Sequence, residues 1–169
     1  EKRKKIRQER RKVSEAGVTF TSLEGRAIQA ADWDFFYKCY AQTYFEHGNA
    51  PYLSRDFFQR MQDTMPENWV LFIAEKEGQR MACSLIAVQD NVAYGRYWGA
   101  LERVDCLHFE ACYYQPIAWC IAKGLARFEG GAQGEHKMAR ALLPVKASSA
   151  HWLAHPDFAD AVERYLEKE

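Results

Sequence analysis

The order of strands and helices between residues 69 and 129 places the strongest limit on the fold of this 169-residue chain. Three short runs rich in β-branched and aromatic residues follow one another with tight polar turns between them, which predicts an antiparallel meander. A helical segment and one more strand come next, and a strand, helix, strand unit predicts a parallel crossover. The predicted strands are 69–75, 81–89, 92–98 and 125–129, and the predicted helix is 108–123. This order requires a mixed sheet.

Further elements on both sides of this unit give the chain an α+β order. Before it we expect a strand at 18–23, an aromatic helix capped by Asp32, and a helix that begins at Ser54 and ends at Pro66. After it we expect a last strand at 148–153 and a helix at 156–169. The side chains expected to face the core are Trp33, Phe36, Tyr37, Tyr40, Tyr44, Phe57, Phe58, Met61, Phe109, Cys112, Tyr113, Ile117 and Ile121. These helices would cover a single mixed sheet.

The charges of the chain are unevenly distributed. Basic and acidic residues both number 23, but residues 1–12 contain eight basic residues and two acids. We expect residues 1–16 to form an exposed basic helix that touches the rest of the chain through Ile6 and Val13, with the domain proper at residues 17–169. Residues 2–12 could bind RNA or an anionic membrane, but the interleaved glutamates and the absence of aromatic side chains favour a solvated linker helix.

The five cysteines form no CxxC pair, which favours reduced thiols and a cytoplasmic protein. The sequence has neither a run of eighteen apolar residues nor the apolar segment of a secretion signal. His151 and His155 are four residues apart, but Pro156 and the strand-like pattern argue against a helix that would align them, so we expect no metal site. Cys112 and Cys120 have no basic neighbour that would activate a thiolate, and we do not expect them to be nucleophiles.

Four segments in order carry a resemblance to a known family. They are residues 94–99 (Tyr-Gly-Arg-Tyr-Trp-Gly), 108–115 (His-Phe-Glu-Ala-Cys-Tyr-Tyr-Gln), 128–137 (Phe-Glu-Gly-Gly-Ala-Gln-Gly-Glu-His-Lys) and 143–144 (Leu-Pro). Together they resemble the N-acyltransferase family labelled peptidoglycan biosynthesis/recognition, which is related to the Fem-type peptidoglycan-bridge acyltransferases. The resemblance implies a GNAT-like acyl-CoA N-acyltransferase fold with a mixed, mainly antiparallel central sheet. It also implies transfer of an acyl or aminoacyl group to an amine, with a cell-wall precursor as one candidate acceptor.

The basic opening segment resembles the helix that begins the second acyltransferase-like domain of Fem-type proteins. By this resemblance we expect the chain to be the C-terminal half of a two-domain protein, preceded by an N-terminal partner domain. An isolated half would expose an apolar face, so dimerisation is a further option.

The resemblance leaves the acyl donor open. Acetyl-CoA enzymes of this superfamily present a Gln/Arg-x-x-Gly-x-Gly/Ala loop before the crossover helix, where backbone N–H groups hold the pyrophosphate. Residues 101–108 stand at that place, and they contain no glycine and two acids. The sequence therefore indicates no pyrophosphate cradle, and both acyl-CoA and aminoacyl-tRNA stay open as donors.

The glycine-rich segment after the last crossover strand carries the first set of candidate site residues. Glu129, at the carboxyl end of that strand, is our first candidate for the base or the amine anchor. Its close neighbours Gly130 and Gly131 allow the backbone to approach a ligand. Further candidates are Glu135 as a catalytic acid, His136 as a proton shuttle, Gln133 and Gly134 as substrate contacts, and Lys137 and Arg140 for a phosphate or carboxylate. The alternative is a solvated polar loop.

A second set of candidates lies on the strand and helix before this segment. Arg96 lies in an aromatic strand beside Tyr94, and because a buried cation needs a partner we expect it to meet Glu110 or Glu129. That pair could be purely structural, or it could orient an anionic substrate. His108 and Glu110 fit the start of the crossover helix through capping and dipole effects, and Tyr114 and Gln115 could reach the cleft.

Three functions are consistent with these residues. The first is an N-acyltransferase that acts in the cleft around residues 129–137. The second is a binding module of the same fold that recognises a peptidoglycan-type or peptide ligand without turnover, which the missing pyrophosphate loop favours. A weaker third is an RNA-contacting domain that uses the basic helix, whose affinity would fall steeply with salt.

Overall fold

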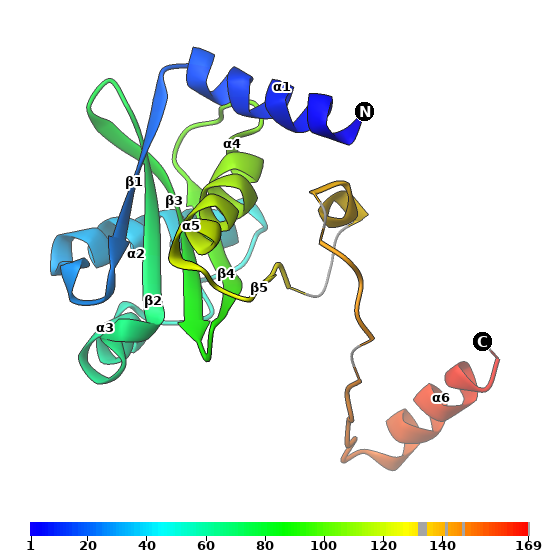
Figure 1. Cartoon of the computed structure of the whole chain (residues 1–169). Helices are drawn as coiled ribbons and strands as arrows, with labels where there is room; N and C mark the ends of the chain where they lie inside the picture. The colour runs from blue at the N-terminus through cyan, green and yellow to red at the C-terminus, as the bar shows by residue number, and fades with distance from the viewer. Residues whose placement is uncertain (132–134, 141, 147, 169) are drawn as a thin grey trace.

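The computed structural model describes residues 1–131, 135–140, 142–146 and 148–168. Within these residues, five strands form one sheet in the order β1-β2-β3-β4-β5 (Figure 1). The first four strands are antiparallel neighbours, and β5 pairs with β4 in parallel. The strands are β1 (Val18–Glu24), β2 (Trp69–Lys76), β3 (Gln79–Gln89), β4 (Val92–Ala100) and β5 (Arg127–Glu129). The predicted meander and parallel crossover are thus confirmed.

Two tight turns connect the meander where the sequence predicted them. The first contains Glu77 and Gly78, and the second contains Asp90 and Asn91. All four residues have positive φ, between 49° and 76°. Two consecutive left-handed residues are typical of the two-residue hairpin turn that follows the twist of the strands.

The helices α2 (Ala30–Glu46) and α3 (Arg55–Thr64) cover one face of the sheet and bury an aromatic core there. Ser54 is the N-cap of α3, as predicted, and its hydroxyl accepts from the Phe57 N–H. Asp32 is not the N-cap of α2; it is the third residue of a capping box whose N-cap is Gln29. Phe57 was expected to face the core but is 39% exposed, because Phe58 takes the inward position.

The crossover helix and α1 (Lys2–Glu15) lie on the opposite face of the sheet, which gives the fold three layers (Figure 1). The crossover consists of α4 (Leu107–Phe109), a π-helical segment η3 (Glu110–Tyr114) and α5 (Gln115–Lys123), which ends at Gly124 with φ 72°. The prediction that Ile121 faces the core is wrong, since this side chain is 75% exposed. α5 buries Pro116 and Cys120 instead, four residues apart on one side of the helix.

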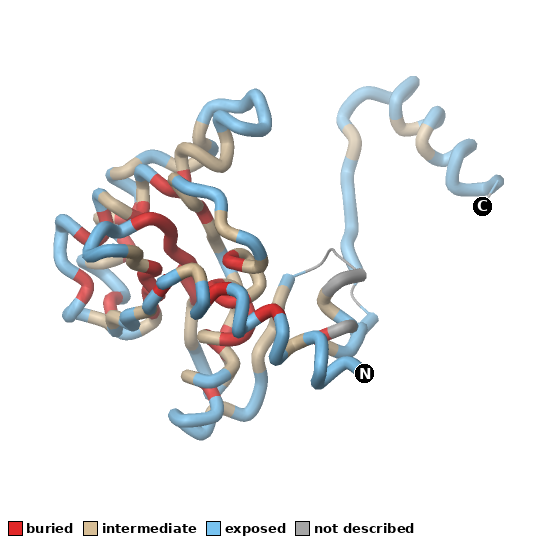
Figure 2. Tube along the Cα trace, turned by 90° about the horizontal axis from the view of Figure 1, so that it is seen from above, coloured by how far each residue is buried: buried red, intermediate tan, exposed pale blue. Residues whose placement is uncertain are grey.

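The last part of the described chain leaves the sheet. A 3₁₀ turn, η4 (Glu135–Arg140), follows β5, and α6 (Pro156–Leu166) contains no buried residue (Figure 2). The strand predicted at residues 148–153 is wrong, since these residues form no strand and Trp152 is 85% exposed. Alternating apolar residues form a strand only where a neighbouring strand accepts their hydrogen bonds. Within the described residues, every helix is too short or too polar to span a bilayer.

Candidate functional site

The strands β4 and β5 separate soon after they meet. Residues 92–94 of β4 pair with residues 127–129 of β5, and β4 then continues to Ala100 paired with β3 only on its other edge. Just past the last pair, β4 contains a bulge: Gly95 is opposite Ile86 and Tyr97 is opposite Leu85, so Arg96 falls between them. A bulge leaves one residue outside the hydrogen-bond ladder and bends its strand. The sheet therefore opens at Arg96.

The bulge also explains why the predicted partner of Arg96 is wrong. The side chain of Arg96 is exposed, and its guanidinium carbon lies 5.4 Å from the ring centroid of Tyr97. The two expected acids have other partners: Glu110 pairs with Arg10 at 3.1 Å and Glu129 pairs with Arg127 at 2.9 Å. An Arg on a bulge is solvated, so it does not need the buried carboxylate that a regular strand position would require.

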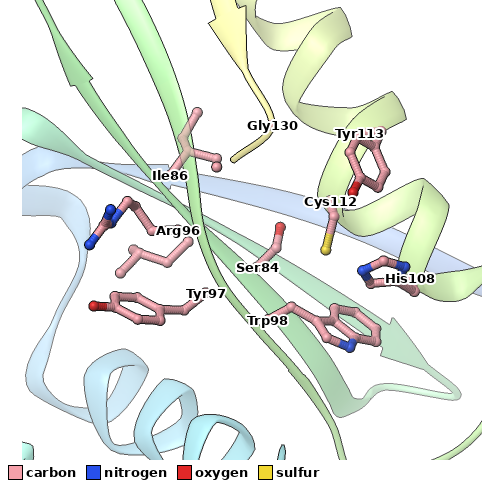
Figure 3. A pocket seen from close by; sticks show the side chains of 11 residues that line it. Ser84, Ile86, Arg96, Tyr97, Trp98, His108, Cys112, Tyr113 and Gly130 are labelled. Atoms are coloured by element: carbon pink, nitrogen blue, oxygen red, sulfur yellow. The ribbon is translucent and has the colours of Figure 1, made fainter. Parts of the chain in front are cut away.

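A cavity of about 140 Å³ lies at the point where β4 and β5 separate. Figure 3 shows His108, Cys112 and Tyr113 of the crossover helix beside Ser84 of β3, whereas Arg96 and Tyr97 point to the other side of β4. The lining residues are Ser84, Leu85, Ile86, Gly95, Arg96, Tyr97, Trp98, His108, Cys112, Tyr113 and Gly130. The crossover-helix side of the cavity thus brings hydroxyl, thiol, phenol and imidazole groups together, while the side chains of Arg96 and Tyr97 lie on the other side of β4.

The crossover-helix side of the cavity is built on the π segment. The Ser84 hydroxyl donates to the Ala111 carbonyl at 2.5 Å, which ties this segment to β3. Burial raises the pKa of the Tyr113 phenol to about 12 and also raises the pKa of the Cys112 thiol, so both groups are neutral at physiological pH. The His108 ring lies 5.4 Å from Trp98 and 5.8 Å from Tyr113 between ring centroids. An imidazole and a neutral phenol therefore share one wall.

Gly130 forms the cavity wall where the chain leaves β5. A Cβ atom at this position would lie 2.7 Å from Leu142 Cδ1 and 3.5 Å from Tyr113 Cε1. The missing side chain lets the segment after β5 pack directly beside the crossover helix. Lys137, from η4, donates to the Gly131 carbonyl at 3.2 Å and so faces this same turn.

A cluster of buried charges lies behind this wall. Arg140 of η4 donates from Nη2 to both carboxylate oxygens of Glu9, at 3.0 and 2.9 Å, and the Tyr114 hydroxyl donates to the same carboxylate. The Glu110 carboxylate accepts hydrogen bonds from the Arg10 guanidinium and, at 2.8 Å, from the Gln115 side-chain amide. The predicted site residues Glu110, Tyr114, Gln115 and Arg140 are thus gathered in this cluster, and none of them is among the residues that line the cavity.

The other predicted site residues lie outside the cavity lining or outside the described part. Tyr94 and Glu129 are opposite each other in the short β4–β5 pairing, and the Glu129 side chain is 42% exposed. Gln133 and Gly134 lie outside the described residues, as do the side chains of Glu135 and His136. Ser84, Trp98 and Glu9 were not predicted; a single serine inside the apolar strand 81–88 was the one local signal for Ser84.

The structure at the start of the crossover helix does not fit the pyrophosphate of coenzyme A. Cys106 is the N-cap of α4 and has a φ of 66°. A glycine at this position, without a side chain, would let a phosphate approach the backbone N–H groups more closely. Val13 of α1 packs in one apolar cluster with Leu107, and Lys12 pairs with Asp105 at 3.4 Å. The start of the crossover is thus packed against α1 and bordered by a carboxylate, which is unfavourable for a pyrophosphate. Among the described residues, no group of three or more His, Cys, Asp or Glu side chains is suited to a metal ion.

Three buried phenols allow a first prediction, for alkaline pH. Burial raises the pKa of Tyr40 and of Tyr113 from 10.0 to about 12. The pKa of Tyr114 is also raised, mainly by burial and in addition by its hydrogen bond to Glu9. A raised folded-state pKa stabilises the protein fully below pH 10, and this contribution is lost as the pH rises through 12. We expect phenolate absorbance from these residues to appear together with loss of the circular dichroism signal. Full ionisation of all tyrosines in a folded protein would contradict this.

The fold is shared with acyltransferases of known structure. The C-terminal domain of a protein assigned as a lysylphosphatidylglycerol synthetase from Agrobacterium fabrum aligns with TM-score 0.55 and 12% identity, over 76% of this chain and 40% of that one. An aminoglycoside acetyltransferase from an uncultured soil metagenomic sample, solved with sisomicin, aligns with TM-score 0.51 and 15% identity, over 85% and 98%. A protein assigned as an acetyltransferase from Clostridium acetobutylicum, solved with acetyl-CoA, aligns with TM-score 0.52 and 11% identity, over 84% and 97%. The predicted GNAT fold is confirmed.

The chain spans less than half the length of the Agrobacterium protein. No curated protein sequence matches it at a significant level. All 169 residues, however, match a family of peptidoglycan biosynthesis/recognition proteins, and this chain therefore belongs to the FemAB-like family.

Proposed function

We propose that this protein is an N-acyltransferase that transfers an acyl or aminoacyl group to an amine in the cavity between β4 and β5. The observation that carries the proposal is the opening of the sheet at the Arg96 bulge, directly opposite His108 and Tyr113. Membership of the FemAB-like family supports a cell-wall precursor as the acceptor. Comparing different precursors in a transfer assay would identify which one is the acceptor.

The cavity supplies the three groups that the reaction needs. The amine attacks the acyl carbonyl, and the bulged backbone of β4 offers an N–H outside the ladder to the oxyanion that forms. His108 accepts the proton that the attacking nitrogen loses. When the bond from the carbonyl carbon to its carrier breaks, the neutral Tyr113 phenol donates a proton to the leaving oxygen or sulfur, and His108 returns its proton to Tyr113 through solvent.

The donor is an activated acyl ester or thioester. The poor fit of a pyrophosphate beside α1 favours an aminoacyl ester over acyl-CoA. Arg96 is exposed on the other side of β4, and it remains the predicted contact for an anionic group of the acceptor. Glu129 remains a second candidate base, and Glu135 and His136 remain predicted catalytic residues. Gly131, Gln133, Gly134 and Lys137 remain predicted contacts of the substrate.

The proposal predicts that His108→Gln lowers kcat about 100-fold, because general base catalysis contributes at least this much. Transfer is measured by mass spectrometry with acetyl-CoA or aminoacyl-tRNA as donor and an amine-bearing peptidoglycan precursor as acceptor. His47→Gln is the matched control, since His47 is exposed and bonds the Thr43 carbonyl outside the cavity. Normal turnover of His108→Gln, together with loss of turnover in Glu129→Gln, would transfer the role of base to Glu129.

A binding module of the same fold is the second candidate. It is favoured by the packing of α1 and by the carboxylate at the start of the crossover, which are unfavourable for a pyrophosphate. The melting temperature of such a module would rise when it binds the precursor, and the module would show no transfer with any donor. The thermal shift of the wild-type protein with each donor and acceptor alone, measured beside the transfer assay, separates the two functions.

The cellular location and the partners of the protein are part of the same proposal. All five cysteines are free thiols, and three of them are buried, which supports a cytoplasmic location. The role of residues 1–16 as a linker to an N-terminal partner domain, and contact of residues 2–12 with RNA or an anionic membrane, stay predictions. Dimerisation also stays a prediction.

A further inference from the structure

We infer that Glu9 and Arg140 are positioning residues, whose ion pair holds His108 and Tyr113 in the wall of the cavity. The inference rests on the proposed transferase function. It gives α1 a part in catalysis, where the sequence suggested a solvated linker. Neither residue lines the cavity, so both would act through other side chains.

The pair is buried and its geometry is specific. The Arg140 side chain is 3% exposed and the Glu9 side chain 9%, although the two residues are 131 positions apart in the sequence. Burying two charges is costly unless their geometry is good and further hydrogen bonds complete it. Here one guanidinium nitrogen contacts both carboxylate oxygens, and the Tyr114 hydroxyl donates to the same carboxylate. The contact therefore fixes α1, η3 and η4 relative to one another.

Arg140 also packs against the aromatic residues behind the cavity wall. Its guanidinium carbon lies 3.4 Å from the centroid of the Phe109 ring, and 5.9 Å from that of Tyr113. The Phe109 ring in turn lies 5.5 Å from the His108 ring. The cation thus backs both proposed proton carriers, because it contacts the ring next to His108 and the ring of Tyr113 itself.

The same anchor sets the opposite edge of the cavity. Arg140 ends η4, whose Lys137 donates a hydrogen bond to the Gly131 carbonyl. Leu142, two residues after Arg140, packs against Gly130. Gly130 is part of the cavity lining. Holding Arg140 on α1 therefore also holds this wall beside Tyr113.

The test is kinetic, and circular dichroism first verifies that the variant is folded. Glu9→Leu with Arg140→Met removes both charges together, which avoids leaving one of them buried without the other. We expect kcat to fall at least tenfold, with KM for the acceptor within about threefold, because the acceptor side at Arg96 is untouched. Arg140→Lys keeps the charge and loses the planar contact with Phe109, so its kcat should lie between that of the double variant and that of the wild type.

The control breaks a comparable ion pair away from the cavity by removing its cation. Arg80 of β3 pairs with the buried Asp32 at 2.8 Å, and Arg80→Met should lower stability while leaving kcat unchanged. Hydrogen exchange of residues 107–115 is the second measurement, and we expect it to become faster in the double variant and not in Arg80→Met.

The outcomes separate the inference from the proposed function. A folded double variant with unchanged kcat, or with unchanged exchange at residues 107–115, would overturn the positioning role alone. Absence of transfer by the wild-type protein, with faster exchange in the double variant, would overturn the proposed function and reduce the pair to a packing contact.

Discussion

Gly99→Ala is expected to lower the free energy of unfolding by about 3 kcal/mol, the upper end of the usual cost of overpacking a core. A Cβ atom at Gly99 of β4 would lie 2.1 Å from the carbonyl oxygen of Cys39 and 2.3 Å from its carbonyl carbon. Both atoms belong to the backbone of α2, so relief requires the whole helix to move. α2 carries Trp33 and Phe36 of the main core, and Thr43 ties it to the Trp98 carbonyl at 3.0 Å.

The measurement is urea unfolding followed by circular dichroism, together with the melting temperature. For a chain of this size, a loss of about 3 kcal/mol lowers the melting temperature by roughly 6–12 °C. Gly95→Ala on the same strand is the matched control, because its Cβ would have its nearest neighbour at 3.5 Å, an ordinary contact. Equal stability of the two variants would show that α2 does not lie as close to β4 as described.

Glu9→Leu is expected to cost about 3–5 kcal/mol, since it removes the carboxylate that faces a buried guanidinium. The same change also takes the acceptor from the Tyr114 hydroxyl. Adding Arg140→Met removes the uncompensated charge, and we expect the double variant to recover most of the loss. Adding Tyr114→Phe as well should recover a further part, because no buried hydroxyl then lacks an acceptor.

A double-mutant cycle of chemical unfolding measures this coupling. Glu15→Leu is the control, because Glu15 is an exposed residue of α1 whose ion pair is the i,i+4 contact with Arg11. We expect it to change the stability by less than about 0.5 kcal/mol. A single Glu9→Leu variant that is as stable as Glu15→Leu would mean that the carboxylate is solvated, as the sequence alone suggested.

The sheet could be predicted from the sequence because its signals are local. Turn residues such as Gly78 and Asn91 need positive φ, and the apolar runs between them have the length of single strands. The site was predicted only in part. The glycine-rich segment drew attention to the end of β5, and Gly130 does line the cavity. The candidate ionisable groups were sought in that segment, whereas the cavity takes His108 and Tyr113 from the crossover helix.

The bulge at Arg96 could not be predicted, because it depends on register. In the sequence Tyr94, Arg96 and Trp98 alternate and so indicate one face of a regular strand. One additional residue between the partners of Leu85 and Ile86 changes which side each later residue faces. The information for this shift lies in the fit of β4 to β3 and is not visible in β4 alone.

Glu9 shows the same limit at longer range. A carboxylate among eight basic residues is typical of a solvated helix, and nothing within one helical turn indicates burial. Its environment is created by Arg140, Tyr114 and the crossover helix, all of them distant in sequence. Burial of a charged residue depends on its partner, so local patterns predict it poorly.

The great sequence distance between Glu9 and Arg140 also has a consequence for the order of folding. The entropic cost of closing a loop rises with its length, and this contact closes one of 131 residues, whereas the β2–β3–β4 meander closes only short turns. Contacts that form after the transition state affect the unfolding rate far more than the folding rate. We therefore expect the contact between α1 and Arg140 to form late in folding and to open early in unfolding.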